Sequence, residues 1–154
     1  MTLWTDAGSD ARRRVELWLM VGILLVGTFF RFLSPTTVPP GPSHDELRMM
    51  QLGELIVDGE RPLHWKISYS AEPLYMYFLA FAMRIWGFTP FAARLVTRFA
   101  GLLLVAGTHH LIRRLFGRPT ALLTSGVMAI SWWPLFFSRV ALRGLTLPLF
   151  FTAA

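Results

Sequence analysis

The sequence predicts an all-α integral membrane protein, a multi-span helical bundle with an external loop that carries surface helices. Composition is the first observation behind this prediction, because 54 % of the 154 residues are hydrophobic and only 16 % are charged. A soluble domain has about a quarter of its residues charged. The second observation is that the apolar residues form runs long enough to cross a bilayer, and arginines flank these runs.

The charges are divided unevenly along the chain. No Asp or Glu follows Glu72, and the net charge is +6. A basic chain suits nucleic acid only when the charge forms a stripe on a soluble face, whereas these arginines border apolar runs, as lipid head groups favour. We therefore expect a lipid bilayer as partner and no nucleic acid. The arginines after Glu72 are Arg84, Arg94, Arg98, Arg113, Arg114, Arg118, Arg139 and Arg143.

The chain has no cysteine, which excludes disulfide frameworks, thiolate zinc sites and cysteine nucleophiles. It also contains no P-loop and no dinucleotide-binding fingerprint. His44 and Asp45 are neighbours that could suggest a metal, but adjacent residues on a helix point about 100° apart and converge poorly on one ion. The sequence thus predicts no cofactor with certainty and does not support a divalent-metal site.

The first membrane span is predicted at residues 15–33, after a cytoplasmic N-terminus at residues 1–14. Arginines at positions 12–14 precede this apolar run of about 19 residues, an order that places the N-terminus of a spanning helix in the cytoplasm. A cleavable signal peptide begins in the same way. The residues after the run offer no small-x-small cleavage site, so we expect a retained anchor.

Residues 34–89 are predicted to form an external loop with two helices. Ser43 with Glu46 three residues later forms a capping box, which predicts an amphipathic surface helix at 44–58 ended by Gly59. Its expected apolar stripe is Met49, Leu52, Leu55 and Ile56. The apolar segment at 73–86 reaches only about 21 Å as a helix, short of a bilayer core of about 30 Å, so we expect a surface or re-entrant helix.

Two further spans are predicted at residues 90–116 and 120–137, joined by a cytoplasmic turn at 117–119. Thr89 and Pro90 provide a cap and a first turn for the earlier of these helices. An external turn at 138–144 then leads to the start of a truncated span at 145–154. In a competing layout the 73–86 segment crosses the membrane, which would put Arg94 and Arg98 inside and the larger basic cluster outside. We favour the first layout because it keeps that cluster in the cytoplasm.

Asp45 is the predicted general base. A carboxylate in the first turn of a helix is favoured in its charged form, and at a membrane surface it can accept a proton from a nearby hydroxyl. The alternative is that Asp45 merely occupies a first turn, where acids are common. Glu46 completes the candidate catalytic pair, although the capping box alone accounts for it.

Basic residues provide candidates for binding a lipid phosphate. Arg139 and Arg143 are spaced i, i+4, so on a helix they would share a face and could clamp a phosphate with their guanidinium groups. Snorkelling at a helix end is the alternative for both. Lys66 and Arg94 are weaker candidates, and Glu72 is expected to pair with one of these bases.

The order of these landmarks resembles the GT-C membrane glycosyltransferases. Most similar are the dolichyl-phosphate-mannose protein mannosyltransferase family and the lipid A aminoarabinose transferases. The resemblance covers about residues 14–154. Its landmarks are the basic start and first span, Pro39-Pro40-Gly41 followed by His44-Asp45-Glu46, Glu72-Pro73-Leu74, Ala93-Arg94-Leu95, Arg113-Arg114-Leu115-Phe116-Gly117 and Phe137-Ser138-Arg139.

The resemblance implies a polytopic enzyme of the plasma membrane that works on its extracytoplasmic side. It implies transfer of a sugar from a dolichyl or undecaprenyl phosphate carrier to a hydroxyl of a protein, lipid or glycan acceptor. Asp45 would act as the base, the anomeric carbon would invert, and basic residues would hold the departing lipid phosphate.

Two departures from the family pattern affect these expectations. Many relatives carry a second Asp after the Ser-Arg pair, where this chain has Ala141, Leu142, Arg143 and Gly144. The family also has more spans, so the chain is expected to be an N-terminal part that does not catalyse transfer alone. The alternative from another class of protein is a non-catalytic membrane component, either a transporter fragment or an assembly subunit. An acidic residue at the membrane midplane would support the transporter.

Overall fold

The computed structural model describes residues 3–34, 40–61, 63 and 73–153. Within these residues it contains helices and no strand, which confirms the all-α class. The elements are α1 (Leu3–Phe32), α2 (His44–Val57), α3 (Pro73–Trp86), α4 (Pro90–Phe116), α5 (Arg118–Ile130), α6 (Trp132–Arg139), the 3-10 helix η1 (Arg143–Leu145) and α7 (Thr146–Ala153).

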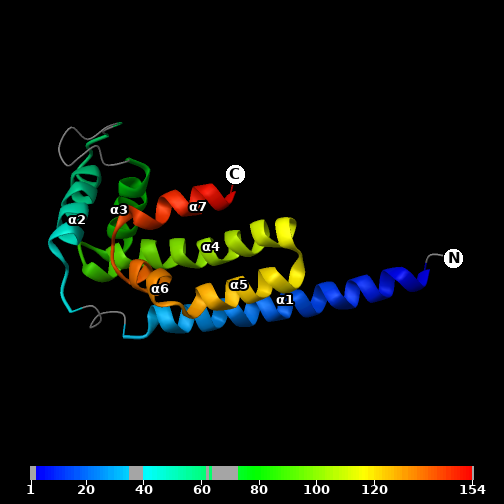
Figure 1. The fold of residues 1–154 in the computed structure, drawn as a ribbon. Coiled ribbons are helices and arrows are strands. Elements are labelled where there is room, and N and C mark those ends of the chain that lie inside the picture. The colour runs from blue at the N-terminus through cyan, green and yellow to red at the C-terminus, as the bar shows by residue number, and fades with distance from the viewer. Residues whose placement is uncertain (1–2, 35–39, 62, 64–72, 154) are drawn as a thin grey trace.

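The long helices run alongside one another, and the short ones gather at one end. Figure 1 shows α1, α4 and α5 lying side by side, α7 beside α4, and α2 and α3 across the end of the bundle. That end also receives α6 and the end of α1. At the far end α1 runs past the connection between α4 and α5, and its first turns project beyond the other helices (Figure 1).

Two described helices are long and apolar enough to cross a membrane, α1 from Asp10 to Phe32 and α4 over Pro90–Phe116. The pair α5 and α6 passes the same test jointly, with a bend of 53° between its two helices. The predicted bounds of the 90–116 span agree with α4. α3 is not among these candidates, and its placement at the membrane surface stays a prediction.

The span predicted at 120–137 is broken in the structure. Helix α5 ends at Ile130, Ser131 is extended, and α6 begins at Trp132. Pro134 gives the physical reason, because a proline has no N–H to donate to the carbonyl four residues earlier, here that of Ile130. The chain therefore turns at Ser131, and α6 leads to the end of the bundle where α2 lies.

Local capping signals set the helix starts as predicted. The Ser43 hydroxyl accepts a hydrogen bond from the Glu46 N–H at 3.2 Å. The Glu46 carboxylate in turn accepts one from the Ser43 N–H at 2.9 Å. Thr89 caps α4 by accepting from the Ala92 N–H at 3.2 Å. Gly59 follows the last turn of α2 with a φ of +107°, a conformation that glycine adopts at little cost.

The α2 helix packs against α3 with a different face from the one predicted. Met49 and Leu52 are buried as expected, but Met50 is buried as well and Leu55 is exposed. The reason is Gly53, which lets the helices approach closely. A Cβ at this position would lie 3.1 Å from the Met83 Sδ atom. The buried core here comprises Met49, Met50, Leu52, Tyr75, Met76, Leu79, Met83, Ala92, Ala93 and Ala141.

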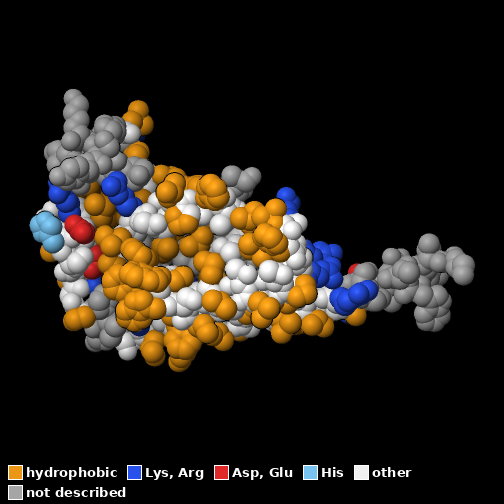
Figure 2. Space-filling model, viewed as in Figure 1, with side chains coloured by type: hydrophobic (Ala, Val, Ile, Leu, Met, Phe, Trp, Pro, Cys, Tyr) orange, Lys and Arg blue, Asp and Glu red, His pale blue; other side chains and the backbone are white. Residues whose placement is uncertain are grey.

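Large apolar side chains remain exposed along the bundle. Figure 2 shows hydrophobic side chains covering its length, with a group of Lys and Arg side chains near the N-terminal part of α1. Trp18, Leu25 and Leu123 are 75 %, 64 % and 72 % exposed. A soluble monomer rarely exposes so much contiguous apolar surface, so this surface suits lipid contact and a membrane protein.

Candidate active site

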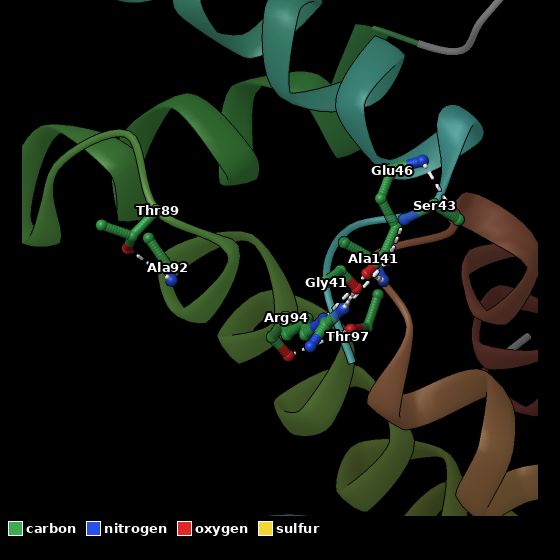
Figure 3. A network of polar contacts seen from close by, with 8 residues as sticks. All are labelled: Gly41, Ser43, Glu46, Thr89, Ala92, Arg94, Thr97 and Ala141. Atoms are coloured by element: carbon green, nitrogen blue, oxygen red, sulfur yellow. Dashed lines mark hydrogen bonds and ion pairs between the residues drawn. The ribbon is translucent and has the colours of Figure 1, made fainter. Parts of the chain in front are cut away.

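The buried carboxylate of Glu46 connects three separate parts of the chain. Its Oε1 atom accepts hydrogen bonds from the Arg94 Nε atom at 2.9 Å and from the Ala141 N–H at 2.8 Å. Its Oε2 atom accepts from Arg94 Nη2 at 3.1 Å and from the Ser43 N–H at 2.9 Å (Figure 3). The α2 helix is thereby joined to α4 and to the segment after α6.

The Glu46–Arg94 pair is almost completely buried, with side-chain exposures of 2 % and 1 %. Burial by itself raises the pKa of Glu46, but the hydrogen bonds from Arg94 and from the Ala141 and Ser43 N–H groups outweigh it and lower that pKa. Glu46 is therefore a charged anchor and a weak proton acceptor. These contacts are those of a positioning residue, and its predicted catalytic role stays a prediction.

Arg94 also fixes the chain that leads into α2. Its Nη2 atom donates to the Gly41 carbonyl at 2.5 Å, and the Thr97 hydroxyl donates to the Arg94 carbonyl at 3.0 Å (Figure 3). Gly41 has a φ of +68°, in the left-handed region that suits glycine. Because the guanidinium faces Glu46 and Gly41, the phosphate role predicted for Arg94 finds no support in this geometry.

Asp45 lies exposed in the first turn of α2, beside the buried Glu46. Consecutive helical residues point about 100° apart, so anchoring Glu46 fixes the direction in which its neighbour projects. The carboxylate of Asp45 thus has a rigid support and access from outside. His44, the residue before it, is exposed too.

A group of arginines lies next to this anchor, where α1, α4 and α6 meet. Arg31 and Arg98 are both 0 % exposed, and Arg139 is half-buried. Arg139 donates to the Leu33 carbonyl at the end of α1, and the Arg98 guanidinium carbon lies 5.3 Å from the centre of the Phe32 ring. Arg98 is also close enough to Arg94 and Arg139 for their charges to repel. We call Arg31, Arg98 and Arg139 the arginine cluster.

Several N–H groups of the arginine cluster have no acceptor. Arg31 Nη1 donates to the Gly27 and Ala129 carbonyls at 3.0 and 3.3 Å. Within the described part of the chain, Arg31 Nε and Nη2 and Arg139 Nε are buried without a hydrogen-bond partner. No carboxylate among the described residues lies within ion-pair distance of Arg31 or Arg139. Buried unpaired donors are costly, which favours an anion at this position.

Gly101 allows the arginine cluster to form. A Cβ at Gly101 would lie 2.6 Å from the Ser138 Cβ atom and 3.0 Å from Arg31 Nε. We expect Gly101→Ala to destabilise the protein by about 1–3 kcal/mol, because the rigid Ser138 Cβ forces α4 and α6 apart. Thermal unfolding in detergent checks this. Gly22→Ala is the matched control, since nothing lies within 4 Å of the added carbon, and equal midpoints for the two variants would contradict the expectation.

The remaining predicted site residues are not brought together. Arg139 ends α6 and Arg143 begins η1, with extended residues at Val140 and Leu142 between them, so they do not share a helical face. The shared face expected from their spacing is therefore wrong, because the helix stops at Arg139. Lys66 and Glu72 lie outside the described residues. Among those described, no three His, Asp or Glu side chains gather where they could hold a metal ion.

Sequence reasoning missed Arg31 and Arg98. Both lie within apolar helices, and an arginine inside a membrane span needs a partner or a function. That signal was present in the sequence, but it could not show that these two residues meet each other and Arg139. Their meeting depends on how α1, α4 and α6 pack.

A comparison with protein families decides the wider assignment. The family model described as dolichyl-phosphate-mannose-protein mannosyltransferase matches residues 70–153, more than half of the chain. The chain belongs to this family. No curated protein and no solved structure matches it.

Membership of the mannosyltransferase family makes the chain a membrane glycosyltransferase at the level of the family. The family description names dolichyl-phosphate-linked mannose as donor and protein as acceptor. The matched stretch includes Arg94, Arg98 and Arg139 and begins after Asp45 and Glu46. The suspected resemblance is thus confirmed for the part that holds α3 to α7.

Proposed function

We propose that the chain contributes to sugar transfer from a polyprenyl-phosphate-linked donor to an acceptor hydroxyl outside the cytoplasm. The observation that carries this proposal is the placement of α2. The Glu46–Arg94 pair anchors its first turn beside the arginine cluster, so an exposed carboxylate and an anion-binding group lie at one end of the bundle.

Asp45 acts as the general base in this proposal. It accepts the proton of the acceptor hydroxyl while that oxygen attacks the anomeric carbon of the donor sugar. The bond between the anomeric carbon and the phosphate oxygen breaks, and its electron pair leaves with the lipid phosphate. Attack opposite the leaving group inverts the anomeric carbon. Glu46 positions Asp45 and takes no proton, in keeping with its lowered pKa.

The arginine cluster stabilises the departing phosphate. Arg139 is the partly exposed member and makes the direct contact, while Arg31 and Arg98 lie behind it and add positive charge. Guanidinium groups suit this task because they remain charged and offer paired donors to phosphate oxygens. Arg143 and Lys66 stay predicted phosphate ligands, and Glu72 stays their predicted partner.

Arg139→Ala is expected to weaken use of the lipid donor. A charge-assisted hydrogen bond contributes about 1.5–3 kcal/mol, so kcat/KM for the donor should fall about 10–100-fold. Assays at varied donor concentration in the membrane-embedded enzyme measure this. Arg84→Ala, which changes an exposed arginine on α3, should leave it unaltered. An unchanged donor dependence in Arg139→Ala would count against the phosphate role.

Charge supports the proposed orientation in the plasma membrane. The N-terminal part of α1 runs past the connection between α4 and α5 at the far end of the bundle (Figure 1), and both segments are rich in arginine. Placing that end in the cytoplasm puts Asp45 outside. Accessibility labelling of a cysteine introduced at position 87 tests this layout. Labelling from the cytoplasmic side would contradict it.

A further inference from the structure

A second buried polar group joins three helices at the far end of the bundle from Glu46. Glu16 on α1, His109 on α4 and Ser125 on α5 form a row. The His109 Nε2 atom lies 3.3 Å from Glu16 Oε1, and its Nδ1 atom lies 3.2 Å from Ser125 Oγ. Ser125 is fully buried, and the side chains of His109 and Glu16 are 12 % and 8 % exposed. These residues have no role in the sugar transfer proposed above.

The single hydrogen of the Ser125 hydroxyl limits which atoms in this row can donate. The Ser125 Oγ atom lies 2.6 Å from the Ala121 carbonyl oxygen, a separation that requires the hydroxyl proton between the two oxygens. The hydroxyl has one proton, so toward His109 it can only accept. A hydrogen bond between Ser125 Oγ and His109 Nδ1 therefore requires a hydrogen on Nδ1.

The other ring nitrogen needs a hydrogen as well. An ionised carboxylate only accepts, so a bond between His109 Nε2 and Glu16 requires a proton on Nε2. Both contacts can therefore be hydrogen bonds at the same time only in the cationic form of His109, which carries a hydrogen on each ring nitrogen. Arg113 Nε lies 2.6 Å from Glu16 Oε1 and Arg118 Nε lies 3.2 Å from Glu16 Oε2, so both arginines form ion pairs with Glu16.

We propose that Glu16, His109 and Ser125 form a proton-dependent clasp that fixes α1 against α4 and α5. When His109 loses a proton it can satisfy only one neighbour. It bonds either to Ser125 through Nδ1–H or to Glu16 through Nε2–H, and the second choice forces the Ser125 hydroxyl away from Ala121. The clasp therefore holds when His109 is charged and loosens when it is neutral.

The charged groups around the clasp keep it from opening completely. Arg113 and Arg118 remain charged near neutral pH, so their ion pairs with Glu16 persist whether or not His109 is protonated. Helix α7, which packs on α4, contributes no titratable group. The other titratable residues at this end whose side chains the structure describes are Asp10, Arg12, Arg13 and Arg14 on α1, and His110 and Arg114 on α4.

The clasp acts on the same helix that carries Arg31. Glu16 and Arg31 are fifteen positions apart on α1, a distance of about 22 Å along a helix. A change in the packing of α1 against α4 at one end therefore changes the position of Arg31 in the arginine cluster at the other end. The clasp provides a route by which pH at one end of the bundle changes its packing.

Spin labels can test the clasp because the chain has no native cysteine. Cysteines at two exposed positions, Arg13→Cys on α1 and Thr120→Cys on α5, would carry them in the full chain in lipid nanodiscs. We expect a narrow distance distribution at about pH 5.5 and a broader one at about pH 8.5, since histidine changes charge in this range. An unchanged distribution would overturn the proposal.

Matched variants isolate His109 as the group responsible. In His109→Gln the distribution should no longer depend on pH, whereas His110→Gln, which changes the exposed neighbour, should keep the wild-type response. A wild-type response in His109→Gln, or its loss in His110→Gln, would contradict the clasp.

Ser125→Ala gives the sharpest test because it removes only the hydroxyl group. Without the hydroxyl, Nδ1 no longer needs a hydrogen, so neutral His109 can donate to Glu16 through Nε2–H. The distribution should then stay narrow at both pH values. Retention of the wild-type pH response in Ser125→Ala would refute the hydrogen count on which the clasp depends.

Discussion

Asp45→Asn is expected to lower sugar transfer by about 10²–10⁴-fold, the contribution typical of a general base. The amide keeps the size and hydrogen-bonding shape of the carboxylate but cannot take up the acceptor proton. Asp45 is exposed and outside the buried core, so the variant should insert and fold like the parent. Turnover in the active, membrane-embedded enzyme measures the effect, together with the amount of folded protein.

Asp58→Asn is the matched control for that experiment. Asp58 is an exposed acid at the other end of α2 and should leave turnover unchanged. Transfer by Asp45→Asn near the parental rate would end the assignment of this residue as the base. Loss of transfer together with loss of folded protein would show that Asp45 stabilises α2 instead.

Local signals in the sequence predicted the helix starts because capping depends on residues close in the chain. The Ser43–Glu46 box, Thr89 before Pro90, and Gly59 after α2 each act within a few residues. The break at Ser131 also had a local cause, in Pro134, but the apolar run around it favoured an unbroken span. Here a specific backbone effect outweighed a general composition signal.

Contacts between residues far apart in the chain could not be predicted from such local signals. Glu46 and Arg94 are 48 positions apart, and the sequence accounted for Glu46 by capping alone. The structure shows that one carboxylate both caps α2 and binds Arg94. Similarly, the helical spacing of Arg139 and Arg143 was an incomplete guide, because the helix ends between them. Packing between helices decides both outcomes.

Arg94→Ala is expected to have the largest effect on stability, a loss of about 3–5 kcal/mol. The reason is that the variant leaves the Glu46 carboxylate buried without its partner, while the Gly41 carbonyl loses its donor too. The α2 helix should then separate from α4. Thermal unfolding in detergent and protease cleavage near α2 measure this, and a midpoint equal to that of the parent would contradict the anchoring role.

Removing both partners separates the cost of an unpaired charge from the value of the pair. The double variant Glu46→Gln with Arg94→Met should be more stable than Arg94→Ala, since no buried charge remains without a partner.

The dependence of stability on acid pH provides an independent check on Glu46. Because hydrogen bonding lowers the folded pKa of Glu46, its contribution is complete above the ordinary value of 4.5 and is lost as the pH falls toward the folded value. Glu46→Gln has no carboxyl to titrate, so acid should weaken the docking of α2 in the parent more than in this variant. Equal acid sensitivity in both would mean that other carboxylates hold α2 in place.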